Sequence, residues 1–274
     1  MGRAARKEDK SLLLDDTGAH MGRNRPCLVY DGEDSDKMFC FESIVRYSEI
    51  DAKGQMTLSA VLDLLQDCCT FQSEEAGIGI EFLRQKHRAW VLSSWQVVIE
   101  RYPKMGEKIR VYTWPYDFKN FMGYRNFKIE DTAENIISYA NSVWVYLDTD
   151  SGHPVRVPKE VQECYTFEPP YEMERSSRKI RLSADMQPKE PIRVGRFHID
   201  TNQHVNNSKY VMMAEEYLPE SYLVRELRAE YKKAAVLSDI IYPKVKETED
   251  NITVALEDEG GNPYAIIEFM EDKV

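Results

Sequence analysis

The sequence predicts an α+β fold in which one unit, a long helix lying across an antiparallel sheet, occurs twice in tandem. Residues 50–62 (IDAKGQMTLSAVL) and 199–211 (IDTNQHVNNSKYV) begin alike, and an offset of 149 residues pairs Asp51 with Asp200. Each segment leads into apolar residues at helical spacing, and each helical stretch is followed by runs with the composition of β-strands. A repeated order of elements predicts a repeated fold.

The first unit begins with a strand near residues 38–46. Its helix carries one buried stripe, because apolar side chains recur at i, i+3, i+4 and i+7, and Gly77 ends it. The stripe is formed by Val61, Leu64, Leu65 and Cys68. Four strands are expected next, separated by breaks at Pro103, Gly106, Asn120 and 148–154, and they cover 90–102, 108–118, 121–130 and 136–147.

The second unit repeats this order after a strand at 192–198. Its helix has the same spacing, with Tyr210, Met213, Ala214 and Tyr217 on the stripe and Pro219 ending it. Strands are expected at 223–235, 239–245, 252–257 and 264–270. A single helix buries its stripe by lying across the sheet beside it, which is the hotdog arrangement. The two copies are expected to pair as a pseudo-dimer, a tandem double hotdog.

Composition divides the chain further. Residues 1–36 are polar and aperiodic, contain the sequence Gly-Ala-His-Met of a cloning junction, and are predicted to be disordered and tag-like. The first hotdog is placed at 37–157 and the second at 191–274. Between them, 158–190 is polar and rich in proline, as expected of a linker.

The overall composition excludes several classes of protein. With 42% hydrophobic residues a packed core is expected, but no apolar run reaches about 18 residues, so no membrane span is predicted. The five cysteines are odd in number and form no CxxC motif, which favours the reducing cytoplasm over a disulfide or zinc framework. A net charge of −11 argues against nucleic-acid binding. Local basic clusters are either solvated faces or docking sites for an acidic partner.

The two repeats differ at the turn before the helix. Lys53 of the first copy becomes Asn202 in the second, and Gln55 becomes His204. In an extended segment Asp200, Asn202 and His204 would point the same way, beside a helix N-terminus that favours negative charge. Thioester hydrolysis needs a base or nucleophile, an orienting group and donors for the oxyanion, and this cluster could supply them.

Two other interpretations of this turn stay open. Asparagine and aspartate commonly form turns and helix caps, which would make the cluster structural and His204 an ordinary polar loop residue. A metal site is the second alternative, because His198, Asp200 and His204 are close in sequence. No further histidine or cysteine lies nearby to complete such a site, so no metal is predicted.

Several segments, in order along 38–274, resemble acyl-acyl carrier protein thioesterases of bacteria and plant plastids. The strongest match is the run DTNQHVNN at 200–207, close to the family signature DxNxHVNN. Strand-like matches are WV at 90–91, QVVIERYP at 96–103, SVWV at 142–145 and EYKK at 230–233. The resemblance implies a double hotdog that hydrolyses fatty acyl-acyl carrier protein thioesters to free fatty acid and holo carrier protein. It places the acyl chain mainly in the first half and the chemistry in the second.

The mechanistic hypothesis follows from the signature and from the contrast between His204 and Gln55. His204 acts as general base through water, or as nucleophile, while Asn202 holds the water or the carbonyl. Asp200 orients them or braces the turn, and backbone N–H groups of Val205 and Asn206 stabilise the oxyanion. No cofactor is expected, because the substrate itself carries phosphopantetheine, whose thiolate is a good leaving group.

Further residues are assigned to substrate and partner. The acyl tunnel is expected to use Trp90, Leu62 and Phe71, since side-chain volume sets tunnel depth. Docking of acyl carrier protein is assigned to Lys232, Lys233 and Arg178. Whether two copies of the chain form a homodimer is left open.

The chain departs from the family pattern at two places. Ala234 stands where members usually carry glutamate, and Glu230, four residues earlier, is a weak substitute about 13 Å away at strand rise. His198 stands where members tend to carry an acidic residue, and a local adjustment is expected there. Two alternatives therefore stay open: an acyl-CoA thioesterase on the same fold, and an inactivated hotdog that binds acyl chains or carrier protein.

Overall fold

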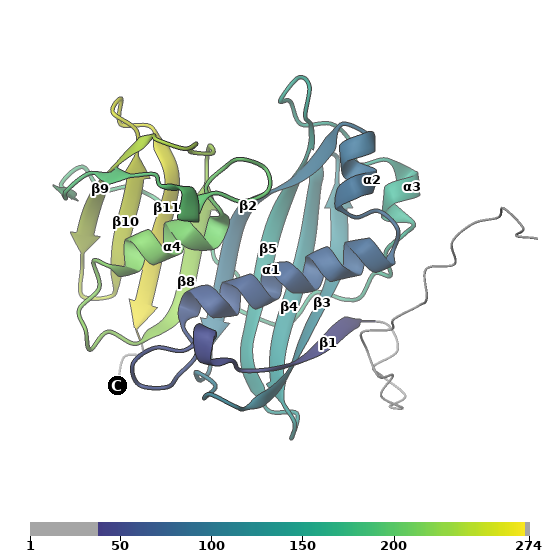
Figure 1. The fold of residues 1–274 in the computed structure, drawn as a ribbon, viewed down its shortest axis with the longest axis horizontal. Helices are drawn as coiled ribbons and strands as arrows, with labels where there is room; N and C mark the ends of the chain where they lie inside the picture. The colour runs from purple at the N-terminus through teal and green to yellow at the C-terminus, as the bar shows by residue number, and fades with distance from the viewer. Residues whose placement is uncertain (1–37, 272–274) are drawn as a thin grey trace, which may run out of the picture.

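A computed structural model describes residues 38–271, which form an 11-stranded antiparallel sheet with helices on one face (Figure 1). The predicted disordered segment at 1–36 lies outside the described residues. In the first half the strands are β1 (Phe39–Ile44), β2 (Arg88–Ile99), β3 (Lys108–Lys119), β4 (Met122–Asp131) and β5 (Ile136–Asp148). In the second half they are β6 (Gln187–Pro188), β7 (Ile192–Arg193), β8 (Val224–Tyr231), β9 (Ile240–Glu247), β10 (Asn251–Glu257) and β11 (Pro263–Glu271).

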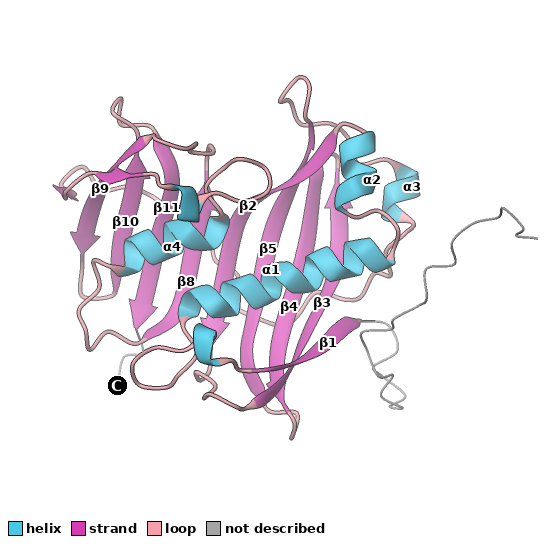
Figure 2. Cartoon of the chain, in the orientation of Figure 1, coloured by secondary structure: helices cyan, strands magenta, loops and turns pink. Residues whose placement is uncertain are grey.

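The strand order is β1-β3-β4-β5-β2-β8-β11-β10-β9-β6, with β7 also paired to β9. Read outward from the β2–β8 junction, the second half repeats the first, strand for strand. The predicted duplication is therefore present in the topology. Figure 2 shows the two main helices, α1 (Leu58–Glu75) and α4 (Asn207–Glu215), across the same face of the sheet.

Helix α1 forms where the apolar stripe predicts it. Thr57 caps its N-terminus by accepting a hydrogen bond from the Ala60 amide at 3.2 Å. Leu65 and Cys68 on the stripe are fully buried against the sheet. Gly77 follows the helix with φ of 74°, a left-handed conformation that glycine adopts without steric cost. None of the described helices is long and apolar enough to cross a membrane.

Helix α4 is half as long as α1, so the prediction of a long helix in each half is wrong for the second. It ends at Glu215, and Tyr217 lies in the following turn rather than on the helical stripe. Two adjacent carboxylates, Glu215 and Glu216, sit at the end where the helix dipole disfavours negative charge. Pro219 then removes an amide donor and restricts the residue before it.

The strand expected at 192–198 is also shorter than predicted. Only Ile192 and Arg193 pair with β9, and residues Arg196–His198 form a 3₁₀ turn instead. The first half has the matching turn at Tyr47–Glu49. These turns bring the chain from the edge of the sheet to the start of each main helix.

The two halves share one sheet and one core. Strands β2 and β8 pair antiparallel over Ser94–Val98 and Glu226–Glu230, which joins the halves through backbone hydrogen bonds. Trp95 and Val97 from β2 and Leu227 from β8 belong to a single buried cluster. Burial of apolar area at this junction stabilises the pairing of the halves.

The segment predicted as a linker, 158–190, is an ordered strap rather than a free connection. It contains a short helix, α3 (Lys159–Gln162), and the edge strand β6, and between them its contacts pass from β3 to β8. Trp114 Nε1 donates to Pro169 O at 2.9 Å, and the Ser176 amide donates to Gln96 Oε1 at 3.0 Å. Because strand side chains alternate, these contacts lie on the face opposite α1.

Candidate active site

The turns before α1 and α4 have the same geometry at an offset of 149 residues. Each is braced by an aspartate whose Oδ1 accepts two backbone amides, so the sequence similarity of the two segments has a structural cause. Asp51 accepts from Lys53 at 2.8 Å and Gln55 at 3.0 Å, and Asp200 accepts from Asn202 at 2.7 Å and His204 at 3.4 Å. Of the roles considered for Asp200, this geometry favours bracing the turn.

The expectation of an extended segment at 200–204 is wrong. The Gln203 amide donates to Asp200 O at 3.1 Å, which closes a tight turn, and Gln203 has φ of 64°. The first half has Gly54 at this position with φ of 75°. A non-glycine residue in this region costs about 1–2 kcal/mol, so the second copy holds a strained turn where the first is relaxed.

His198 takes over the structural task of Glu49, its partner in the first repeat. The Glu49 carboxylate accepts from the Arg46 amide at 2.8 Å, and His198 Nδ1 accepts from the Gly195 amide at 2.9 Å. Burial lowers the pKa of His198, with a smaller effect from the charge of Lys209. The ring is thereby kept neutral and able to accept, which is the local adjustment expected at this departure.

Both predicted oxyanion donors are already used, which corrects that assignment. The Val205 amide donates to Ala235 O and the Asn206 amide to His198 O, each at 2.9 Å. Asn206 acts instead as the N-cap of α4, accepting from the Ser208 amide at 2.9 Å. Within residues 38–271 the Asn207 amide has no backbone or side-chain acceptor, which is common for the first amide of a helix.

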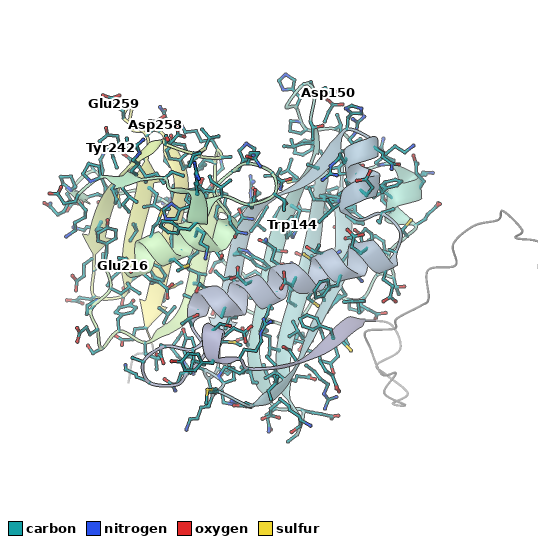
Figure 3. The ribbon with its side chains drawn as sticks, viewed as in Figure 1. Trp144, Asp150, Glu216, Tyr242, Asp258 and Glu259 are labelled. Atoms are coloured by element: carbon teal, nitrogen blue, oxygen red, sulfur yellow. The ribbon has the colours of Figure 1, made fainter. Side chains whose placement is uncertain are left out.

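A cavity of about 720 Å³ connects the two halves. The second half contributes Asp200, Asn202 and Asn207 to its wall, while one stripe of α1 and the inner side chains of the first sheet contribute most of the rest. Asn207 Nδ2 donates to Gln66 Oε1 of α1 at 3.2 Å, which fixes the turn beside the cavity. Trp144, labelled in Figure 3, also lines it from β5.

His204 is exposed and belongs to the same turn, but it does not form part of the cavity wall. Its backbone forms an isolated bridge with Val236. The structure thus brings Asn202 to the cavity and leaves His204 beside it. Among residues 38–271 no three His, Cys, Asp or Glu side chains gather as metal ligands, and that includes His198, Asp200 and His204.

Models of the acyl-ACP thioesterase family match most of the chain. Residues 36–165 match its N-terminal domain and residues 183–268 its C-terminal domain. The chain belongs to the acyl-ACP thioesterase family. Among its relatives, the chloroplastic oleoyl-acyl carrier protein thioesterase of Coriandrum sativum is 25% identical over 245 residues, covering 81% of this chain and 66% of the relative. The chloroplastic palmitoyl-acyl carrier protein thioesterase of Cuphea hookeriana is 29% identical over 208 residues, covering 69% of this chain and 50% of the relative.

Solved structures confirm the double hotdog fold. An acyl-ACP thioesterase from Bacteroides thetaiotaomicron superposes with a TM-score of 0.79 at 22% identity, covering 86% of this chain and 98% of that one. The 12:0-ACP thioesterase from Umbellularia californica gives a TM-score of 0.75 at 19% identity, covering 86% and 97%. The chain spans about half to two thirds of the length of the curated plant relatives.

The thioesterase family's glutamate position lies next to the turn. Ala234 is exposed, and its neighbour Ala235 accepts from the Val205 amide. Glu230 does not replace the missing carboxylate, because it is buried and bound by the Ile180 amide at 3.0 Å and by Lys232 Nζ at 2.5 Å. The sequence-based suggestion of Glu230 as a substitute is therefore not supported.

Of the three residues assigned to the acyl tunnel, one lines the cavity. Trp90 lines the wall and stacks on Phe118 at 5.8 Å between ring centroids. Leu62 is buried in the core and does not line the cavity. Phe71 points to the outer side of α1, 45% exposed and edge-on to Phe41 at 5.4 Å, so both assignments are corrected.

The residues assigned to carrier docking are exposed but mostly paired. Lys232 binds Glu230, and Lys233 binds Asp258. Arg178 donates to Ser93 Oγ at 2.8 Å.

Sequence reasoning missed several residues of the cavity wall. Arg84 and Arg88 belong, with Lys86, to a basic cluster that is visible in the sequence, and the structure places both arginines and His87 on the cavity wall. His87 Nδ1 lies 3.0 Å from Asp150 at the tip of the loop after β5 (Figure 3). Arg125 gave no sequence signal beyond its place in a strand.

Proposed function

We propose that this chain hydrolyses the thioester between a fatty acyl group and acyl carrier protein, releasing free fatty acid and holo carrier protein. The observation that carries the proposal is the cavity, which runs from the interior of the first half to the Asn202 turn of the second. An acyl chain held along α1 would present its thioester at that turn. Family membership supports the same reaction.

The geometry favours His204 as general base through water over His204 as nucleophile. Asn202 forms part of the wall and His204 does not, so a water molecule held by Asn202 bridges the imidazole and the carbonyl carbon. Asp200 braces the turn and thereby positions both side chains. The Asn207 amide at the start of α4 donates to the developing oxyanion.

In this mechanism water attacks the carbonyl carbon as His204 takes its proton. The tetrahedral intermediate then expels the phosphopantetheine thiolate, which takes up a proton. No metal or cofactor of the protein is required, because the thiolate leaves readily. The substrate brings its own phosphopantetheine.

The decisive experiment measures free thiol released from acyl carrier protein thioesters of several chain lengths. His204→Ala and Asn202→Ala should each lower kcat by about 100-fold or more, the usual size of a general-base effect. The matched controls are Gln55→Ala and Lys53→Ala, which make the same changes in the equivalent turn of the first half and should leave turnover unchanged. Full turnover by a folded His204→Ala variant would overturn the mechanism.

Ala234 is the specific observation that favours a second candidate, a non-catalytic binder of acyl chains or carrier protein. No thiol release by the chain as given, with activity restored in Ala234→Glu, would identify an inactivated thioesterase. No thiol release by either protein, with acyl binding retained, would establish a non-catalytic binding protein. Equal turnover of acyl-CoA, unaffected by charge reversal at Lys232, Lys233 and Arg178, would identify an acyl-CoA thioesterase.

The proposal includes a role in fatty acid synthesis with acyl carrier protein as partner, in the cytoplasm. Its compartment rests on the cysteine content of the sequence. The plant relatives described above carry chloroplastic names, so fractionation of the source cell is the test of this point. A homodimer stays a prediction, which sedimentation measures directly.

A further inference from the structure

The cavity contains a buried cation without a counter-ion. Arg125 of β4 is 7% exposed and forms part of the cavity wall. Its Nη1 donates to Gln72 Oε1 and, at 3.0 Å, to Thr113 Oγ1, both neutral acceptors. Within residues 38–271 no carboxylate lies within ion-pair distance of this guanidinium. Burying a charge without an opposite charge is costly, so such a group calls for a partner.

The guanidinium also has donors to spare. A guanidinium carries five N–H groups, and Arg125 uses only those on Nη1 for protein contacts in the described part of the chain. No buried side-chain nitrogen or oxygen there is sealed off without a partner. The Nε and Nη2 donors of Arg125 are therefore open to the cavity rather than enclosed by protein.

The side chains in contact with Arg125 offer oxygen atoms but no anion, and the two aspartates of the cavity wall, Asp67 and Asp200, form no ion pair with it in the described part of the chain. Tyr165 packs its ring 5.2 Å from the Arg125 guanidinium, and its hydroxyl lies 2.9 Å from Ser73 Oγ. The Ser73 hydroxyl donates to Cys69 O, so Tyr165 donates to Ser73. Burial raises the pKa of Cys69 to about 11 and also raises the pKa of Tyr165, which leaves both groups neutral.

Helix geometry sets how far along the axis of α1 Arg125 lies from the turn. Gln66 of α1 contacts Asn207 beside the turn, and Gln72 of the same helix contacts Arg125. Six residues of α-helix span about 9 Å, which an extended acyl chain covers with roughly seven carbons. The cavity follows α1, since Gln66, Cys69 and Ser73 on one helical stripe all line it.

We propose that this cavity selects acyl chains that carry a hydrogen-bond-accepting oxygen roughly six to eight carbons from the thioester, and that Arg125 is the specificity-determining residue. The inference rests on the proposed thioesterase function and names its substrate class. A hydroxyl or a carboxylate at this depth receives the free donors of Arg125. An unsubstituted chain of the same length leaves those donors without an acceptor.

The test compares octanoyl, ω-hydroxyoctanoyl and suberoyl thioesters of acyl carrier protein in the thiol-release assay. The oxygenated substrates should exceed octanoyl in kcat/KM by roughly 10- to 100-fold, the effect of one charge-assisted hydrogen bond. The two oxygenated arms show whether the site takes a neutral hydroxyl or a carboxylate. Arg125→Met should bring the ratio close to one.

The matched control is Arg110→Met, which removes an arginine of similar burial on β3 that lies outside the cavity wall. It should keep the wild-type ratio. If Arg125→Met does not fold, Arg125→Lys keeps the charge but loses the planar fork, and it should lose most of the preference.

A binding measurement separates failure of this inference from failure of the proposed function. Free ω-hydroxyoctanoate or suberate should raise the Tm of the wild-type chain and not of the Arg125 variant. Faster hydrolysis of octanoyl than of both oxygenated substrates, unchanged in the Arg125 variant, would overturn the inference and leave the thioesterase standing. If no thioester is hydrolysed, the absence of a Tm shift with either free acid overturns the inference by itself.

Discussion

Glu215, the last residue of α4, gives a prediction about stability and pH. Burial, together with a smaller effect from the neighbouring charge of Glu216, labelled in Figure 3, raises the pKa of its carboxyl to about 7 from the ordinary 4.5. The C-terminal end of a helix also disfavours a negative charge. The repeat places Glu215 at the position of Gln66 in α1. Replacing Glu215 with glutamine therefore copies the neutral group already present in the first half.

The sign and size of the effect follow from linkage. The folded protein keeps the Glu215 proton up to about pH 7, whereas the unfolded chain releases it near 4.5. The free energy of unfolding therefore falls as the pH rises through this window. Each pKa unit corresponds to 1.36 kcal/mol, and part of this side chain remains in water, so the loss is about 1–3 kcal/mol.

The assay is urea denaturation of the wild type and of Glu215→Gln at about pH 4 and about pH 8, which lie on either side of the window. The variant should be more stable than the wild type at the higher pH by about 1–3 kcal/mol and differ little at the lower pH. Glu216→Gln, at the exposed neighbouring position, is the control and should have a smaller effect. A Glu215 variant that gains nothing at pH 8 would refute the reasoning.

Five further substitutions, in three comparisons, test the turns and the cavity. Asp51→Ala and Asp200→Ala each remove the Oδ1 that accepts from two backbone amides, and each should lower the free energy of unfolding by about 1–2 kcal/mol. Only the Asp200 variant should lose thiol-release activity, and equal activities would contradict a single catalytic turn. Ala234→Glu should raise kcat at least tenfold in the same assay, by placing a carboxylate beside the turn, and an unchanged rate would show that the position is not catalytic. Leu62→Ala should lower the free energy of unfolding, measured by urea denaturation, by about 2–5 kcal/mol without altering the preference for acyl chain length. Trp90→Ala should alter that preference, because Trp90 lines the cavity. The reverse pattern would contradict the assignment of the cavity wall.

Local patterns predicted most of the fold. Helix α1 forms where the apolar spacing predicts it, because the features that specify it are local in sequence. They are the spacing of its buried residues, the Thr57 cap and Gly77. The offset of 149 residues between the repeats also relates equivalent positions in the structure. It pairs the bracing aspartates Asp51 and Asp200, and it pairs the helix caps Thr57 and Asn206. Helix α4 was overestimated because the stripe continues to Tyr217, while Glu215, Glu216 and Pro219 end the helix before it.

The parts of the site that depend on pairing across the fold were not visible in sequence. The motif pointed to a turn that borders the cavity, but the Val205 amide donates to the carbonyl of Ala235, thirty residues later in the chain. Leu62 and Phe71 are apolar residues of the same helix as the cavity stripe, and only the packing shows which face meets the cavity. Arg125 was hidden for the same reason, since a strand pattern does not tell a cavity wall from a solvated face.

The β2–β8 junction has a consequence for the order in which the chain folds. Every hydrogen bond of the junction joins residues about 130 positions apart, as between Val98 and Glu226, whereas β3, β4 and β5 pair as sequential hairpins. Distant pairings close long loops and form slowly. Each half therefore assembles from its own hairpins first, with the edge of β2 open until β8 arrives. An emerging chain passes through a stage with a bare strand edge, the kind of surface on which chains aggregate.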